Sequence, residues 1–306
     1  MDITVLFESF PPSIAQGLLW GVMAIGVYTT YKILNFADLS VDGSLALGGA
    51  VGAVAILSGQ SPWVALLLAT IAGLAAGLVT GILHTVFGIP DILAGILTQI
   101  SLYSINLNIM NGSNLGVSID NYDLIVSLRE INRALLIGAI FVGVIIAVLY
   151  WFFGTEFGMT IRATGCNKEM AHAQGINTSV ATVAVLALSN ALVGLSGALL
   201  MQYQGYADVN MGRGAIVIGL AAVIIGEVLG EAILGKHLNF ALRLAFTALG
   251  AVIYYMVITF VLWLGLPSEN MKLFSAIVVA IFLAVPYLKG KYNSSFARVA
   301  RKGAKS

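Results

Sequence analysis

Few polar side chains interrupt this apolar chain, and three of them recur at helical spacing. Gln99, Tyr103 and Asn106 stand at positions i, i+4 and i+7, so a helix through this segment places them on one face. Two amides and a phenol offer neutral hydrogen-bond donors and acceptors. Such a face favours contact with a polar solute, or hydrogen bonds that hold one helix against another. The residues alone leave both interpretations open.

Carboxylates and amides also gather where the first apolar segment ends, between residues 35 and 44. A carboxylate near a membrane is costly unless it is solvated, capped or paired. We expect Asp42, or Ser44 beside it, to cap the helix that follows, in preference to direct binding of a solute. The polar residues that we consider as candidates for a solute path are Asn35, Asp38, Ser40, Asp42, Gln99, Tyr103, Asn106 and Asn190.

The longest hydrophilic stretch lies near the middle of the chain, at residues 154–175 (GTEFGMTIRATGCNKEMAHAQG), between two strongly apolar segments. Its second half predicts a short helix that starts at an Asn167 cap and ends at Gly175. A short helix on the membrane face suits docking into a groove of a partner protein. A solvated connection between two helices is the alternative.

No group of side chains predicts catalysis or a metal site. The single cysteine, Cys166, cannot form an intrachain disulfide, and no nucleophile constellation or metal-binding spacing occurs. The GxxxxGK[ST] sequence that would cradle the phosphates of ATP is absent as well. We therefore expect no enzyme activity and no cofactor bound by this chain. If ATP drives the protein, ATP and Mg²⁺ bind to another chain.

The composition places these residues in an integral membrane protein. Apolar residues make up 59% of the chain and charged residues 9%, whereas globular domains carry about 25% charged residues. Apolar segments recur that are long enough to cross the hydrocarbon core as helices. We expect an all-α polytopic membrane protein with about nine transmembrane helices, at residues 13–33, 44–58, 62–87, 91–110, 134–153, 177–203, 214–229, 240–265 and 273–288.

The distribution of lysine and arginine predicts the orientation. Eleven of the fifteen cations fall in the C-terminal tail or in connections expected on the same side of the membrane. Under the positive-inside rule, residues 289–306 form a basic cytosolic tail and the N-terminus lies outside. Residues 1–12 then form an external interfacial segment, residues 13–288 the transmembrane domain, and residues 154–176 a cytosolic loop.

Two of the expected spans, 44–58 and 214–229, are short and interrupted by glycine, and a broken or re-entrant helix would fit either one. Each follows an aspartate-containing stretch, in corresponding places of two halves, which is the pattern of an inverted repeat. Glycines four residues apart predict close helix packing elsewhere. These are Gly17, Gly21, Gly73, Gly77 and Gly81.

Three segments resemble the signature regions of one permease family. They are residues 34–49 (LNFADLSVDGSLALGG), 154–177 (GTEFGMTIRATGCNKEMAHAQGIN) and 205–229 (GYADVNMGRGAIVIGLAAVIIGEVL). With them, most of the chain is similar to the permease subunits of branched-chain amino acid and ribose-type ABC importers. The central segment is the most specific, because it follows the family pattern R-A-x-G-x-N...A...G-I at Arg162, Ala163, Gly165, Asn167, Ala171, Gly175 and Ile176.

The resemblance implies that this central segment is a coupling helix, which docks on a cytosolic ATPase. The residues that it assigns to coupling are Arg162, Gly165, Asn167, Glu169, Ala171 and Gly175. It also implies that the stretch 35–44 and its counterpart in the second half flank the translocation path.

The further partners implied are an external solute-binding lipoprotein and a second permease subunit, with a homodimer expected, in the cytoplasmic membrane of a bacterium. No nucleic acid is expected. Residues 89–112 are similar to a subgroup associated with the uptake of aromatic or other amino acids.

The main alternative is a secondary transporter driven by an ion gradient, with Asp38, Asp42 or Glu227 as the coupling carboxylate. Glu227 is otherwise expected to pair with Lys236 or Arg243. Because few charged residues fall at membrane depth, either kind of transporter is expected to carry a zwitterionic or neutral polar solute.

Overall fold

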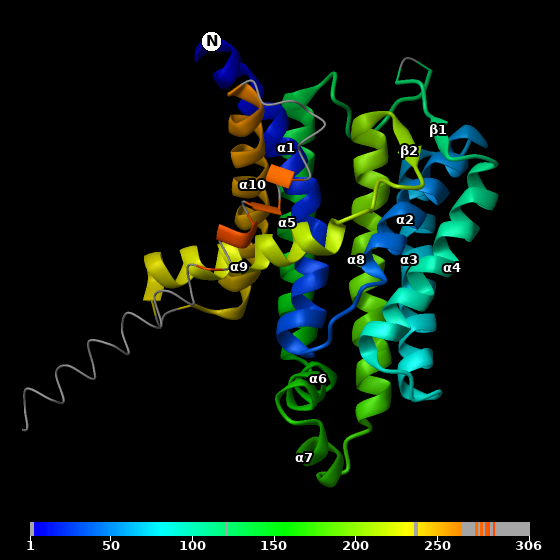
Figure 1. The fold of residues 1–306 in the computed structure, drawn as a ribbon, viewed down its shortest axis with the longest axis vertical. Coiled ribbons are helices and arrows are strands. Elements are labelled where there is room, and N and C mark those ends of the chain that lie inside the picture. The colour runs from blue at the N-terminus through cyan, green and yellow to red at the C-terminus, as the bar shows by residue number, and fades with distance from the viewer. Residues whose placement is uncertain are drawn as a thin grey trace, which may run out of the picture.

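The computed structural model describes residues 3–119, 121–235 and 238–264, and a few positions between 273 and 284. Almost all of these residues are helical, as the sequence predicts (Figure 1). In chain order the elements are α1 (Ile3–Tyr28), the π-helix η1 (Thr29–Ile33), α2 (Val41–Leu57), α3 (Pro62–Thr85), α4 (Asp91–Met110), β1 (Asn114–Gly116), α5 (Ile131–Gly154), α6 (Glu156–Cys166), α7 (Lys168–Ala173), α8 (Thr178–Gln204), β2 (Tyr206–Asp208), α9 (Ala215–Leu234) and α10 (Phe240–Trp263).

Seven helices in the described part of the chain are long and apolar enough to cross a membrane. Helix α2, with 17 residues, is a shorter apolar helix. The expected span at 273–288 falls mostly outside the described residues. The prediction of a polytopic helical membrane protein is therefore confirmed, whereas the count of nine and the inverted repeat stay predictions.

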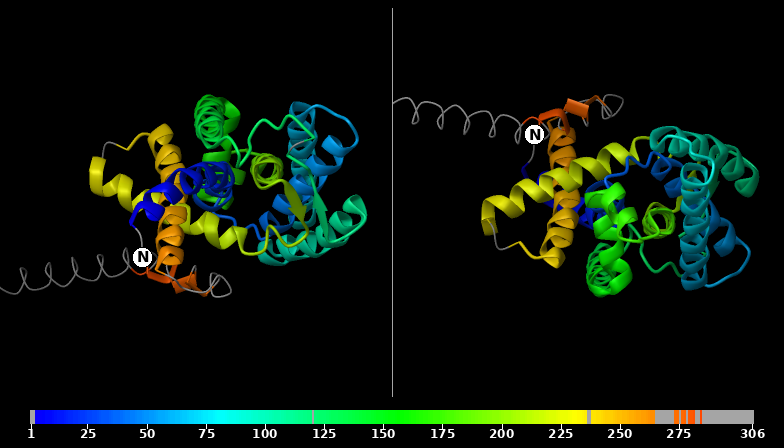
Figure 2. Two further views of the ribbon diagram at one scale, coloured as in Figure 1. Left: turned by 90° about the horizontal axis from the view of Figure 1, so that it is seen from above. Right: turned by 90° about the horizontal axis from the view of Figure 1, so that it is seen from below.

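The two short spans form continuous helices, so the expectation of a break is wrong for both, while a re-entrant course stays a prediction. Their glycines serve close packing instead. A Cβ on Gly48 would meet the backbone of Gly194, and a Cβ on Gly226 would meet the backbone of Phe246. Helix α9 also departs from a simple crossing, because it lies across the direction of α1, α5 and α8 (Figure 1). Seen from above, α5 and α8 appear nearly end-on and α9 lengthwise (Figure 2).

Helix α8 is the centre of the bundle. It lies between the side formed by α1 and α5 and the side formed by α2, α3 and α4 (Figures 1 and 2). It is also the most buried of the seven long helices. The predicted glycine stripe of α3 faces it, and a Cβ on Gly73, Gly77 or Gly81 would meet the backbone of Asn190, Leu186 or Val183. The expectation of close packing at this stripe is confirmed.

The two ends of the bundle differ. The N-terminus and the small antiparallel sheet of β1 and β2, in which Leu115 pairs with Ala207, lie at one end, while α6 and α7 lie at the other (Figure 1). Residues 3–12 form the first part of α1, which contains Pro11 and Pro12. The segment expected at the membrane interface is thus the first part of this helix, and its depth in the membrane stays a prediction.

The α3–α8 contact generates a stability prediction. We expect Gly77→Ala to lower the free energy of unfolding by roughly 1–3 kcal/mol, because the added methyl group must displace backbone rather than a movable side chain. Gly143→Ala on α5 is the matched control, since a Cβ there meets nothing within 4 Å. Thermal unfolding of the detergent-solubilised chain measures both. Equal midpoints for the two variants would contradict the packing argument.

Candidate functional site

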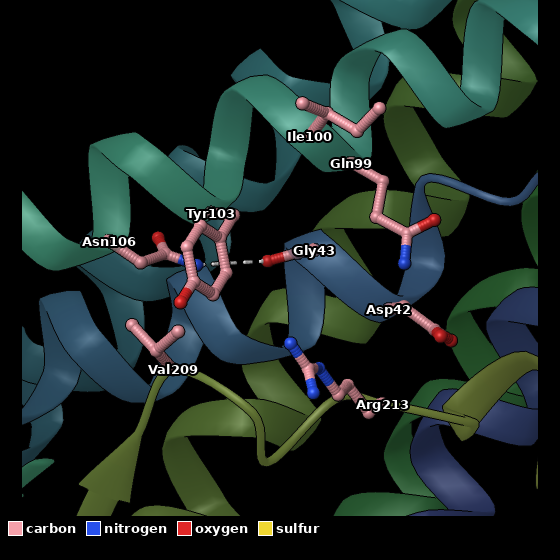
Figure 3. Close-up of a pocket in the computed structure, with 8 residues that line it drawn as sticks. All are labelled: Asp42, Gly43, Gln99, Ile100, Tyr103, Asn106, Val209 and Arg213. Carbon is pink, nitrogen blue, oxygen red and sulfur yellow. Dashed lines mark hydrogen bonds between the residues drawn. The ribbon is translucent and has the colours of Figure 1, made fainter. Parts of the chain in front are cut away.

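A cavity of about 310 Å³ opens between α4, the start of α2 and the connection from β2 to α9 (Figure 3). Three of its residues are the ones predicted to share a helix face, which confirms that face of α4. Four of the eight candidates for the solute path line the cavity. Its lining comprises Asp42, Gly43, Gln99, Ile100, Tyr103, Asn106, Val209 and Arg213.

Asn106 connects α4 to α2 and retains an unused acceptor. Its side chain is fully buried, and Nδ2 donates a hydrogen bond of 3.4 Å to the carbonyl oxygen of Gly43. Gly43 has no side chain, so the backbone of Gln99 approaches the position of its Cβ to 3.1 Å. Asn106 Oδ1 has no hydrogen-bond partner. A buried amide oxygen without a partner is unusual in a native protein, and it is ready to accept a hydrogen bond from a bound molecule.

Asp42 caps α9 rather than its own helix, which corrects the expectation from the sequence. Its Oδ2 accepts a hydrogen bond from the N–H of Gly214, and its Oδ1 accepts one from the N–H of Ile216, both at 2.9 Å. A carboxylate at a helix N-terminus satisfies free N–H groups and interacts favourably with the helix dipole. Gly214 adopts a φ of +88° at this turn. Asp42 lies in the first turn of α2, but its carboxylate accepts no hydrogen bond from the backbone N–H groups of that helix.

Arg213 supplies a cation that sequence reasoning did not assign to the site. Its side chain is exposed, and in Figure 3 the guanidinium group lies between Asp42 and the α4 side chains. Among the described residues the Arg213 side chain makes no hydrogen bond and no ion pair, whereas its backbone N–H donates to the carbonyl oxygen of Asn210. The signal available in the sequence was a single arginine in the short polar stretch just before an apolar helix.

Asp38, Ser40 and Asn190 form a separate buried network. The N–H of Ser40 (2.9 Å) and its hydroxyl (2.5 Å) both donate to Asp38 Oδ1. Asn190 Nδ2 donates to Asp38 Oδ2 at 2.7 Å. Asp38 lies in the connection between η1 and α2, where burial raises the pKa of its carboxyl and the hydrogen bonds oppose that rise. This network ties the connection to α8, so Asn190, a candidate for the solute path, holds two segments of the chain together through its hydrogen bonds.

Asn35 belongs to neither of these groups. It has a φ of +55° and lines a second cavity, of about 290 Å³, at the α6–α7 end of the bundle. Gly165, Asn167 and Lys168 line the same cavity. The structure therefore places one candidate for the solute path beside candidates for ATPase coupling.

The central hydrophilic segment is two helices, α6 and α7, rather than a loop with one short helix. The predicted start and end of the second helix are confirmed. Asn167 Oδ1 accepts a hydrogen bond of 2.9 Å from the N–H of Met170, and Gly175 has a φ of +82°. Helix α6 starts at a Thr155 cap, whose hydroxyl accepts a hydrogen bond of 3.2 Å from the N–H of Gly158. Its 11 residues combine apolar and polar side chains, which concealed it within a hydrophilic stretch.

Two contacts attach α6 to the bundle. Gly165 packs against the backbone of η1, where a Cβ would collide with the carbonyl of Ile33. The guanidinium of Arg162 lies 4.5 Å from the ring centroid of Phe240, at the start of α10, and 5.7 Å from that of Phe153. Cations over aromatic faces attract the ring electrostatically. Arg162 thus contacts its own chain, while Glu169 on α7 is exposed.

Glu227 of α9 joins three elements near the same end. Its carboxylate lies 2.6 Å from Lys32 Nζ of η1 and 3.6 Å from an Arg243 guanidinium nitrogen of α10. The expected pair with Arg243 is confirmed, and the contact with Lys32 was not expected. Lys236 lies outside the described residues.

The Asp42 cap generates a second prediction about the stability of the chain. We expect Asp42→Ala to lower the free energy of unfolding by about 1–2 kcal/mol, because two N–H groups at the start of α9 lose their acceptor. Asp42→Asn keeps one oxygen acceptor and should lose less. Asp123→Ala is the control, since that carboxylate is 96% exposed. Chemical unfolding of the solubilised chain measures the three variants, and an unchanged value for Asp42→Ala would refute the cap.

Comparison with known proteins tests the family resemblance. A family model described as the branched-chain amino acid transport system permease component matches residues 12–286. The tyrosine transport system permease protein of Clostridioides difficile (strain R20291) is 39% identical over 287 residues, which cover 94% of each chain. The ribose import permease protein of Escherichia coli (strain K12) is 28% identical, over 86% of this chain and 81% of its own length. No solved structure matches the chain.

The family match spans nearly all of the described bundle, including the cavity beside α4 and the α6–α7 pair. It confirms the resemblance that three short segments suggested. The chain therefore belongs to the family of branched-chain amino acid transport system permease components, which are permease components of ABC-type transport systems for small solutes.

Proposed function

We propose that this chain is the membrane permease of an ATP-driven importer whose solute is an amino acid. The 39% identical relative is named for tyrosine transport, and the sugar permeases among the relatives are less similar. ATP and Mg²⁺ would bind to a cytosolic ATPase, an external solute-binding lipoprotein would deliver the solute, and a second copy of the chain would complete the permease. The observation that carries the proposal is the α6–α7 pair at one end of the bundle (Figure 1).

This pair supplies a surface for the ATPase. Met170 on α7 is 61% exposed, and Lys168 and Glu169 beside it are exposed as well. An exposed methionine flanked by charges suits a partner groove with an apolar centre and a polar rim. Gly165 and Arg162 on α6 would then carry the movement of the ATPase into η1 and α10, through their contacts with Ile33 and Phe240.

Helix α9 can carry that movement further, to the solute cavity. Near its C-terminal half, Glu227 pairs with Lys32 of η1 and Arg243 of α10. At the N-terminus of α9, Asp42 in the cavity wall accepts hydrogen bonds from two backbone N–H groups. A displacement of η1 or α10 would therefore shift the start of α9 and the wall beside it. We propose that this transverse helix links nucleotide-driven closure at one end to the opening of the cavity.

The ion-gradient alternative has less support, because each carboxylate that it would use is already engaged. Asp42 is bound by backbone N–H groups, and Glu227 is paired with two cations. Asp38 accepts hydrogen bonds from Ser40 and Asn190. A carboxylate that exchanges ions or protons during each cycle would have to break these contacts every time.

The docking surface can be tested by charge substitution on α7. We expect Met170→Glu to abolish co-purification of the proposed cytosolic ATPase, because a buried carboxylate without a partner opposes docking. The exposed side chain leaves folding intact. Asp123→Lys, at the opposite end of the bundle, should retain the ATPase. Normal capture by the Met170→Glu chain would remove α7 from the proposed interface.

A further inference from the structure

We infer that the cavity between α4 and the β2–α9 connection is a binding subsite for a zwitterionic amino acid, with Arg213 as the group that takes the α-carboxylate. This inference rests on the proposed function, because it assumes that the solute passes this cavity. It adds a binding subsite and a specificity-determining residue to that function.

The two charged groups at the cavity have opposite signs, and only one of them already has hydrogen-bond partners. The Asp42 carboxylate is held by the N–H groups of Gly214 and Ile216, so its hydrogen-bonding capacity is largely used while its negative charge stays in the wall. The Arg213 guanidinium is charged and has no partner among the described residues. A guanidinium presents donors in a fork that matches a carboxylate, and such bonds are charge-assisted.

The net charge of these two groups is zero, which selects against ions of either sign. A zwitterion can place its carboxylate at Arg213 and its ammonium toward the side of Asp42, so both charges are favoured at once. An anion would face Asp42, and a cation would face Arg213. A neutral sugar would leave the guanidinium without a counter-charge.

The wall of α4 supplies the remaining polar contacts. Asn106 Oδ1 is buried and has no hydrogen-bond partner, so it would accept a hydrogen bond from a solute group that reached it. In Figure 3 the amide of Gln99 points toward the side of Asp42, and the hydroxyl of Tyr103 points toward Val209. Both side chains belong to α4, whereas Arg213 belongs to the connection between β2 and α9.

The size and the apolar part of the lining limit the solute. A volume of about 310 Å³ lies at the lower end of the range for small-molecule pockets, which is roughly 300–1,000 Å³. Ile100, Val209 and the ring of Tyr103 supply apolar surface. These features fit a single amino acid with an apolar or aromatic side chain.

Binding of a matched set of probes to the full chain in nanodiscs tests the subsite. The probes are L-phenylalanine, 3-phenylpropanoate, which lacks the ammonium, phenethylamine, which lacks the carboxylate, and D-ribose. We expect thermal stabilisation by millimolar L-phenylalanine to exceed that by each other probe, because a ligand raises the unfolding midpoint according to its affinity. The absence of stabilisation by L-phenylalanine, or an equal effect of D-ribose, would overturn the inference.

Variants then assign the carboxylate to Arg213. Arg213→Gln should weaken L-phenylalanine binding by about tenfold or more, and should strengthen the weak phenethylamine binding because a repelling charge is removed. Arg213→Lys should recover part of the loss. Asn106→Leu should weaken L-phenylalanine binding, whereas Asn108→Leu is the control, because Asn108 is exposed and donates to Ser104 of its own helix. Equal affinity in the wild type and Arg213→Gln would overturn the role of Arg213.

Uptake separates this inference from the proposed function. If ATP-dependent uptake persists and the probes do not distinguish Arg213→Gln from wild type, the subsite is wrong and the importer stands. If the probes behave as expected but uptake proceeds without the ATPase, the importer is wrong and the subsite stands.

Discussion

Helices in a lipid bilayer gain little from leaving lipid for one another, so they associate by close packing and interhelical hydrogen bonds. In this chain that constraint falls on α8, which meets α2 and α3 backbone to backbone through glycines of all three helices. Gly73 and Gly77 lie against α8, and Gly194 and Gly197 of α8 lie against α3 and α2. Asn190, fixed within this contact, holds Asp38 and so the connection that leads into α2. The orientation of Asp42 at the start of α2 follows from this packing.

The orientation of Asp42 in turn fixes the start of α9. Its N-terminus is bound by Asp42, and Glu227 in its second half is bound by cations of η1 and α10. A transverse helix held at both places connects the wall of the cavity beside α4 to the elements on which α6 packs. We propose that this arrangement transmits movement by a rigid body rather than by a change in any single side chain.

Local patterns in the sequence predicted the long apolar helices, the glycine contacts of α3, the Asn167 cap and the shared face of Gln99, Tyr103 and Asn106, because spacing along one helix determines each of these. They did not predict α6, whose apolar and polar side chains are mixed. Local sequence patterns did not predict the contacts between segments that are far apart in the chain. Asp42 was expected to cap its own helix, yet its partners lie 172 and 174 residues away. The transverse direction of α9 and the unpaired guanidinium of Arg213 likewise depend on tertiary packing, which no local spacing encodes.

Cysteine labelling tests most directly whether α6 and α7 lie on the cytosolic side, where an ATPase could bind them. Cys166 is the single cysteine of the chain and is exposed at the end of α6, beside the Gly165 contact with η1. A membrane-impermeant maleimide should label it in inside-out vesicles and leave it unlabelled in intact cells. Labelling in intact cells would place α6 and α7 outside, where no cytosolic ATPase could reach them, and would contradict the account.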